Sequence, residues 1–79
     1  MSEFQLIRAF QRVLGVSPYA YLVQLRVNRA RTLLHQGVAV SEVAYTCGFS
    51  DQSHLTRTFK KAIGVPPGAY QRAVRKRAA

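Results

Sequence analysis

Two segments of the chain repeat each other at an offset of 49 residues, which favours an architecture built from two related units. The segment QLIRAFQRVLGVSPYAY, residues 5–21, aligns with HLTRTFKKAIGVPPGAY, residues 54–70. Chance does not readily match apolar positions together with the glycine and proline that interrupt them. Eight positions are identical: Leu6/Leu55, Arg8/Arg57, Phe10/Phe59, Gly15/Gly64, Val16/Val65, Pro18/Pro67, Ala20/Ala69 and Tyr21/Tyr70.

Each repeated segment predicts a helix, a glycine stop and a second helix that begins at a proline. Gly15 can adopt the left-handed conformation that ends a helix, and Pro18 suits a first helical turn. Gly64 and Pro67 repeat this punctuation. The apolar positions have the i, i+4, i+7, i+8 spacing of one helix face. They are Leu6, Phe10, Val13 and Leu14 in the first segment, and Leu55, Phe59, Ala62 and Ile63 in the second.

A longer helix is predicted between the units, from Pro18 to about Gln36, with Gly37 ending it. Roughly 17 residues at about 1.5 Å each give a length of about 26 Å, comparable with one turn of DNA at roughly 34 Å. Such a helix has the length to hold two recognition helices in successive turns of the major groove. Its apolar stripe is approximated by Tyr21, Leu22, Leu25, Ala30, Leu33 and Leu34.

After the long helix, the pattern predicts a short helix from Ser41, a tight turn at Gly48 and a further helix that starts at Ser50 or Asp51. The small side chain of Ala44 allows two helices to cross closely, and the glycine supplies the dihedral angles of the turn. The chain is therefore predicted to be one all-α, homeodomain-like domain of about five helices. Its expected parts are the remnant of a first helix-turn-helix (1–16), a linker helix (17–37), and a second helix-turn-helix with a C-terminal helix (38–79).

The charge balance points to an anionic partner. Among 79 residues, 12 Lys and Arg stand against 3 acids, which gives a net charge of +9. Nucleic acid is the leading candidate, because no run approaches the roughly 18 apolar residues that span a bilayer and no secretory signal opens the chain. The protein is expected to be cytoplasmic. A chain of this length has room for one lean core, so a large enclosed active-site cavity is not expected.

The three acids each follow a serine: Ser2-Glu3, Ser41-Glu42 and Ser50-Asp51. A serine can accept a hydrogen bond from an unpaired backbone N–H at a helix start, and an acid in the first turn is favoured by the helix dipole. All three pairs are therefore predicted to begin helices, which leaves the remaining surface positive.

The second recognition helix is predicted to carry a polar outer face formed by Ser53, Thr56, Arg57 and Lys60. Arg57 can present a fork to guanine O6 and N7, whereas Gln52, Ser53 and Thr56 can bond base edges or phosphates. Lys60 and Lys61 are better placed as phosphate contacts. The alternative interpretation is an ordinary solvated helix face.

The first unit carries a corresponding outer face. Its members are Phe4, Ile7, Arg8 and Gln11, in which Arg8 matches Arg57 and the apolar pair has the chemistry to contact thymine methyl groups. Alternatively, Phe4 and Ile7 pack against further helices.

The C-terminus carries a basic cluster, which is interpreted either as phosphate contacts or as a frayed, solvated end. Its members are Arg72, Arg75, Lys76 and Arg77.

Neither metal chemistry nor catalysis is expected. Cys47 is the single cysteine and is predicted to be a buried structural thiol beside the turn. His35 and His54 lack the neighbouring acids, histidines or cysteines of a zinc site. No paired acids, glycine-rich phosphate loop or nucleophile with a base is found, so no cofactor and no enzymatic activity are predicted.

The stretches YLVQLRVNRARTLL, residues 21–34, and VSEVAYTCGFSDQSHLTRTFKKAIGVPPGAY, residues 40–70, closely resemble the C-terminal DNA-binding domain of the AraC/XylS family of bacterial transcription regulators. This resemblance implies two helix-turn-helix motifs whose recognition helices enter successive major-groove segments of double-stranded DNA. It assigns base reading to Phe4, Gln5, Ile7 and Arg8 in the first recognition helix, and to Gln52, Ser53, Thr56 and Arg57 in the second.

The chain departs from the family pattern at its start, where the helices that precede the first recognition helix are absent. Full-length relatives often carry a sensing or dimerisation domain. None is expected in this sequence, so no small-molecule effector is implied here. The favoured function is sequence-specific DNA binding, with Lys60, Lys61 and Arg72 on phosphates. Two alternatives stay open: self-association through Leu6, Phe10 and their neighbours, and nonspecific binding of RNA or other nucleic acid by charge alone.

Overall fold

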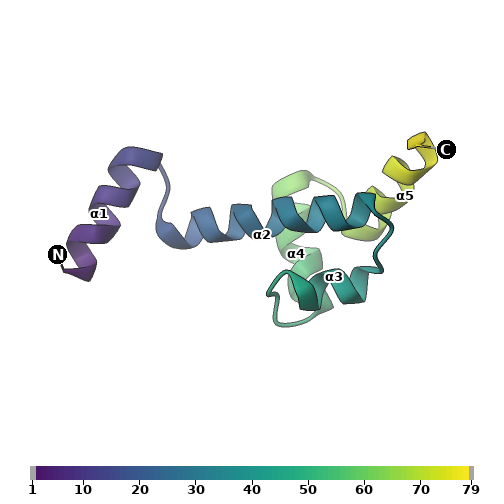
Figure 1. Ribbon diagram of the computed structural model, residues 1–79, viewed down its shortest axis with the longest axis horizontal. Coiled ribbons are helices and arrows are strands. Elements are labelled where there is room, and N and C mark those ends of the chain that lie inside the picture. Colours follow the sequence, from purple (N-terminus) through teal and green to yellow (C-terminus); the bar gives the residue numbers. More distant parts are fainter. Residues whose placement is uncertain (1, 79) are drawn as a thin grey trace.

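Five helices joined by short connections make up the described chain (Figure 1). The computed structural model describes the backbone of residues 2–78 and the side chains of residues 2–76. The all-α prediction is confirmed. The helices are α1 (Glu3–Leu14), α2 (Pro18–His35), α3 (Val40–Thr46), α4 (Gln52–Ile63) and α5 (Pro67–Ala78).

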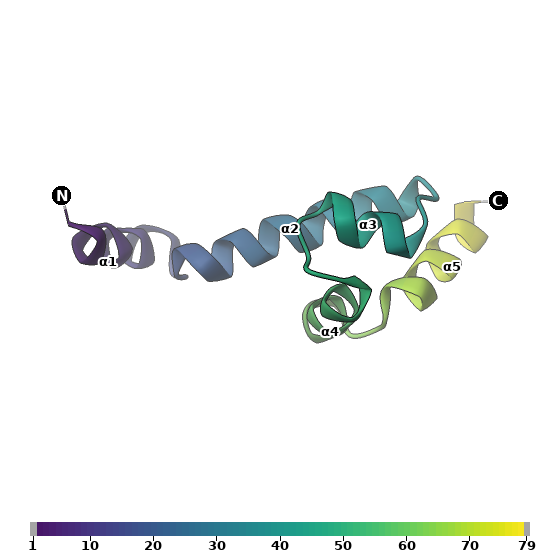
Figure 2. The same ribbon diagram turned by 90° about the horizontal axis from the view of Figure 1, so that it is seen from below.

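The long helix α2 organises the molecule. Its C-terminal half packs with α3, α4 and α5, while its N-terminal half extends away from them and leads back to α1 (Figures 1 and 2). The Cα trace therefore measures 49 × 23 × 18 Å along its principal axes. Within the described residues, no helix is both long enough and apolar enough to span a membrane.

The helix starts follow the predicted serine-acid pairs in two of three cases. Ser2 caps α1 by accepting from the backbone N–H of Gln5, and the Gln5 side chain accepts in return from the backbone N–H of Ser2. At α4 the cap is Asp51, whose Oδ1 accepts from the backbone N–H of His54 at 2.7 Å. The prediction for Ser41 is wrong: α3 begins one residue earlier, at Val40, and its N-terminus has no side-chain cap.

The two repeated units end their first helices in the same way. The backbone N–H of Gly15 donates to the carbonyl of Gln11, and that of Gly64 donates to the carbonyl of Lys60, both at 2.8 Å. The units also share an aromatic contact. Phe10 packs edge-on against Tyr21 with ring centroids 5.5 Å apart, and Phe59 packs against Tyr70 at 5.3 Å with nearly the same interplanar angle. The repeat read from the sequence is therefore a structural repeat as well.

The buried core lies entirely in α3, α4, the turn between them and the C-terminal half of α2. It consists of Val27, Ala30, Leu34, Val43, Ala44, Cys47, Phe49, Leu55 and Phe59. By contrast, α1 has no fully buried residue. Burial differs between α4 and α1 because α2, α3 and α5 all pack against α4, whereas α1 packs against the start of α2.

The apolar stripe predicted along α2 is wrong in its N-terminal half. Tyr21, Leu22 and Leu25 are exposed, because this part of the helix extends beyond the core. Ala30 and Leu34 are buried as predicted, and Val27 joins them although the predicted stripe left it out. On α4, Ala62 is exposed, whereas it was predicted to lie on the packed face.

Side chains of α5 bind the backbone at the end of α2. The Gln71 amide donates from Nε2 to the carbonyls of Leu34 at 3.2 Å and Val38 at 2.7 Å. Arg75 donates to the carbonyl of His35 at 3.1 Å. These bonds add donors at the end of α2, where helix carbonyls lack partners within the helix, and they connect α5 to it. The Leu34 carbonyl also accepts from the backbone N–H of Gly37 at 3.1 Å.

Replacing Gln71 with alanine is expected to lower the free energy of unfolding by about 1–3 kcal/mol, because the partly buried carbonyl of Val38 loses the Gln71 donor, while that of Leu34 keeps the backbone N–H of Gly37. For a chain of this size, each kcal/mol lowers the melting temperature by about 4–8 °C. Thermal melts followed by circular dichroism measure the change. Gln24→Ala, at an exposed glutamine of α2, serves as the matched control. Equal melting temperatures for the two variants would show that the amide does not hold α5.

Candidate nucleic-acid interface

The outer face of α4 presents the four side chains that were predicted to read bases. Gln52, Ser53, Thr56 and Arg57 line one open hollow of about 490 Å³. Thr56 is half-buried and the other three are exposed. This arrangement follows from helix geometry, because positions one, three and four residues apart at the start of a helix gather on one side.

The opposite face of α4 fixes this surface in the molecule. Leu55 and Phe59 are fully buried, and Ile63 packs against the same core. Asp51 holds the first turn through its cap, and the ring of His54 lies edge-on to Phe49 at 5.2 Å. The Nδ1 atom of His54 is also 3.2 Å from the Ser50 backbone N–H, which donates to it. The start of the helix, from which the polar side chains project, is therefore rigidly placed.

The turn between α3 and α4 brings the two helices together as predicted. Ala44 is buried, and its carbonyl accepts from the backbone N–H of Phe49 at 3.0 Å. Gly48 has a φ of +85°, which residues other than glycine rarely adopt. An added Cβ there would lie 3.3 Å from Nε of Arg26. Cys47 is buried beside the turn, and its burial raises the pKa of its thiol, with nearby Arg29 acting in the opposite direction.

The outer face of α1 brings together part of the predicted set. Gln5 and Arg8 line an open hollow of about 510 Å³ together with Ala9 and Arg12. Phe4 is 63% exposed, and its ring lies under the guanidinium group of Arg8, whose carbon is 4.4 Å from the ring centroid.

For two other α1 residues, the structure differs from the sequence prediction. Ile7, which was predicted to point outward, is half-buried and does not line the hollow of Gln5 and Arg8. Arg12 was not singled out from the sequence, although the repeat places it at the position of Lys61. That correspondence was the signal that would have found it.

The basic residues of α4 and α5 differ in the parts of the molecule that they contact. Lys60 and Arg72 are exposed, and Lys61 is exposed beside Tyr19 and Thr58 on the side of α4 that faces α2. The C-terminal basic cluster does not follow α5, as predicted, but lies within it, because the helix continues to Ala78. Arg75 is bound to the end of α2. The side chain of Arg77 lies outside the described residues.

The two outer faces lie on helices that run in the same general direction. In Figure 1 both α1 and α4 begin at the lower side of the molecule and end at its upper side, with α2 between them. Figure 2, seen from below, views α4 nearly along its axis. The N-terminal turns of both helices, which carry the polar and basic side chains described above, therefore project from the same side.

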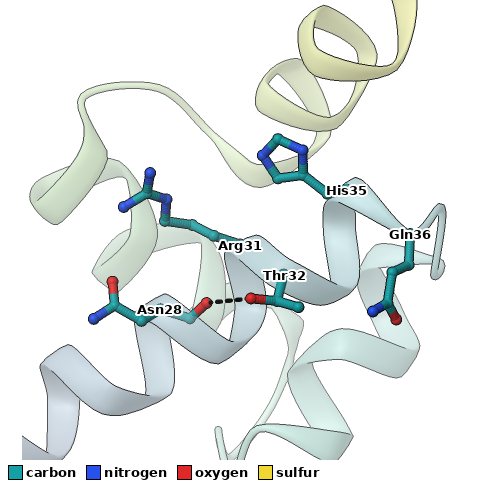
Figure 3. Close-up of a pocket in the computed structure, with 5 residues that line it drawn as sticks. All are labelled: Asn28, Arg31, Thr32, His35 and Gln36. Atoms are coloured by element: carbon teal, nitrogen blue, oxygen red, sulfur yellow. Dashed lines mark hydrogen bonds between the residues drawn. The ribbon is translucent and has the colours of Figure 1, made fainter. Parts of the chain in front are cut away.

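A further polar hollow of about 470 Å³ lies on the C-terminal half of α2, lined by Asn28, Arg31, Thr32, His35 and Gln36 (Figure 3). Three of these side chains, those of Arg31, Thr32 and His35, form hydrogen bonds within the protein. Nε2 of His35 lies 2.8 Å from the Tyr70 hydroxyl, and Arg31 donates to the same hydroxyl at 3.5 Å. The Thr32 hydroxyl donates to the carbonyl of Asn28. The bonds to Tyr70 connect α2 to α5, so Arg31 and His35 in this hollow take part in the packing of α5.

Comparisons with known proteins agree with this geometry. The chain is 41% identical over 68 residues to the transcriptional regulator GbdR of Pseudomonas aeruginosa, which covers 85% of the chain and 18% of that protein. It is 40% identical over 61 residues to the transcriptional activator RhaS of Escherichia coli, which covers 76% of the chain and 22% of RhaS. The chain therefore spans about a fifth of the length of these curated relatives.

Solved structures show the same fold. The DNA-binding domain of the global transcriptional factor AdpA, solved in complex with a target DNA, superposes with a TM-score of 0.92 at 36% identity, over 98% of this chain and 70% of that one. An AraC-type regulator from Chromobacterium violaceum gives a TM-score of 0.83 at 35% identity, over 90% of this chain and 64% of the other. The profile of the helix-turn-helix domain family matches residues 1–73. The chain belongs to this helix-turn-helix family, in its AraC type.

Proposed function

We propose that the chain binds double-stranded DNA sequence-specifically, as the DNA-contacting part of a bacterial transcription regulator. The observation that carries this proposal is the outer face of α4, where Gln52, Ser53, Thr56 and Arg57 form one open polar surface on a helix whose other face is locked in the core. A rigid helix with an open polar face is what reading base edges in a major groove requires.

The side chains on α4 suit different bases. The planar fork of Arg57 matches O6 and N7 of guanine, and the Gln52 amide matches N6 and N7 of adenine. Ser53 and Thr56 carry hydroxyl groups that both donate and accept, and the Thr56 methyl group has the chemistry to contact a thymine methyl. Because Arg57 forms the most discriminating of these contacts, it is assigned the main base-reading role.

The first helix supplies a second set of contacts in this proposal. Gln5 and Arg8 are assigned to base edges, and Arg12 is added to them as a phosphate contact. Phe4 and Ile7 are kept as contacts to apolar base atoms, with Ile7 the less accessible of the two. The helix α2, which joins the two units, has 18 residues and at about 1.5 Å each is about 27 Å long, comparable with the roughly 34 Å of one DNA turn, which supports contacts in two successive major-groove segments. The similar AdpA domain was solved in complex with a target DNA, which supports DNA binding by this chain.

Phosphate attraction is assigned to Lys60, Lys61 and Arg72, in a chain with a net charge of +9. Each phosphate contact releases counterions, so the logarithm of the binding constant falls with the logarithm of salt concentration by about 0.9 per contact. Replacing Lys60 with alanine is expected to reduce this slope by about 1 and to weaken binding equally for all DNA sequences. Fluorescence anisotropy titrations at several salt concentrations measure the slope. An unchanged slope would remove Lys60 from the phosphate contacts.

The remaining assignments complete the proposal. The chain is proposed to act in the cytoplasm, to need no cofactor and to catalyse no reaction. The similar proteins are named as transcription regulators, which supports this assignment.

Selection from a random pool of duplex DNA at near-physiological salt tests the proposal. Enrichment of one motif is the expected result. Competition by RNA equal to that by DNA, with no enriched motif, would instead indicate binding by charge alone. Light scattering on the same preparation distinguishes a third outcome. Self-association that rises with protein concentration while DNA binding is absent would indicate that exposed side chains such as Leu6, Val13 and Leu14 drive assembly.

A further inference from the structure

The two recognition helices carry an arginine at the same repeat position but support it differently. Arg8 of α1 and Arg57 of α4 correspond at the offset of 49 residues. Four residues before Arg8 stands Phe4, whose ring lies 4.4 Å from the guanidinium carbon. Four residues before Arg57 stands Ser53, which has no aromatic ring to stack on. Residues four apart share one side of a helix, so this difference bears directly on how each arginine is held.

The contact with the Phe4 ring restricts Arg8, and no hydrogen bond among the described residues occupies its donors. A guanidinium group is planar, and its N–H donors point outward within that plane. An aromatic ring engages the flat face of the group, which leaves the donor edge free to pair with O6 and N7 of guanine. A long side chain that is already oriented loses less conformational freedom when it binds. The ring therefore lowers the entropy lost when Arg8 forms a bidentate contact.

From this geometry we infer that Phe4 is a positioning residue, which sets the base preference of α1 by orienting the guanidinium group of Arg8. The inference rests on the proposed function, because it assumes that Arg8 reads a base. It changes the role given to Phe4 from a direct contact with an apolar base atom to support of its neighbour. It also makes the two half-sites unequal: the preference read by α1 depends on an aromatic ring, whereas that read by α4 does not.

The test measures how strongly the protein discriminates at the base pair that Arg8→Ala relaxes. Anisotropy titrations compare the selected duplex with one substituted at that pair, and the ratio of the two dissociation constants is the readout. Phe4→Leu keeps an apolar side chain of similar size but removes the ring. It is expected to lower this ratio about two- to fivefold, the effect of losing one exposed cation–π contact. Phe4→Trp, which keeps an aromatic face, is expected to retain the ratio of the parent chain.

A double-mutant cycle separates positioning from direct contact. In an Arg8→Ala background, Phe4→Leu is expected to leave the ratio at this base pair unchanged. Circular dichroism confirms that each variant folds. A parent-like ratio for Phe4→Leu, an equal loss in the Arg8→Ala background, or a loss at a different base pair would overturn the inference.

The same measurements keep the two proposals apart. If Arg57→Ala relaxes a base pair while Arg8→Ala relaxes none, the inference about Phe4 falls and the proposed function stands. If the parent chain enriches no motif and neither arginine affects discrimination, both fall together.

Discussion

Replacing Phe59 with alanine lowers the free energy of unfolding by about 3–5 kcal/mol, the largest stability effect expected of a single substitution in this chain. Phe59 is fully buried among α2, α3 and α5 and is one of the largest side chains in the core. Truncating it removes the transfer free energy of the ring and leaves a cavity that the close-packed surroundings fill only partly. Because small domains are marginally stable, this loss approaches the whole stability of the fold.

The internal repeat supplies a matched control for this prediction. Phe10 is the repeat counterpart of Phe59, and both rings pack edge-on against the equivalent tyrosine at nearly the same distance and angle. Each alanine variant therefore loses a similar aromatic contact. The difference between their free energies of unfolding then reports how deeply each ring is buried. Because Phe10 is only half-buried, Phe10→Ala is expected to cost less than about 2 kcal/mol. Urea unfolding followed by circular dichroism measures both. Equal losses of unfolding free energy in the two variants would contradict a core that excludes α1.

Helix positions could be predicted from the sequence because their signals are local. Glycine at the end of α1 and α4 and proline at the start of α2 and α5 fix helix boundaries through backbone dihedral angles, which neighbouring residues decide. The outer face of α4 could be predicted for a related reason. Leu55 and Phe59 are spaced to pack on one side of the helix, so Ser53, Thr56 and Arg57 were expected to point away from it.

Burial along α1 and α2 could not be predicted in the same way, because it depends on which other helices pack there. Leu22 and Leu25 belong to an apolar stripe by spacing, yet they lie where α2 extends beyond the core. Likewise, Ser41 has the residue type of a helix cap, but α3 begins one residue earlier. The bond from Arg75 to the end of α2 joins residues 40 positions apart, and no sequence pattern indicates it.

Replacing Arg57 with alanine is expected to weaken binding to the preferred DNA site by about 5- to 150-fold, the equivalent of roughly 1–3 kcal/mol for one bidentate base contact. The loss arises because guanine O6 and N7 are left without donors. Alanine is favourable in a helix and the Arg57 side chain is exposed, so the fold is expected to be preserved. Binding to unrelated DNA should fall much less, since one positive charge among many is removed.

Two further variants separate the fork of Arg57 from its charge. Arg57→Lys keeps the positive charge but loses the planar pair of donors, so it is expected to lose most of the base preference while retaining the salt dependence of binding. Lys60→Ala is expected to do the reverse, with weaker binding to every sequence and an unchanged preference. If Arg57→Lys kept the full preference of the parent chain, charge and not the fork would be responsible.

The most direct test of base reading by α4 is a complete substitution profile of the selected DNA site. Each base pair is replaced in turn, and the dissociation constant of every duplex is measured for the parent chain and for Arg57→Ala. The account predicts that the penalty for substitution disappears in the variant at one or two adjacent base pairs and persists at all others. A variant profile that is weaker by the same factor at every position would contradict it, because Arg57 would then contact only the DNA backbone.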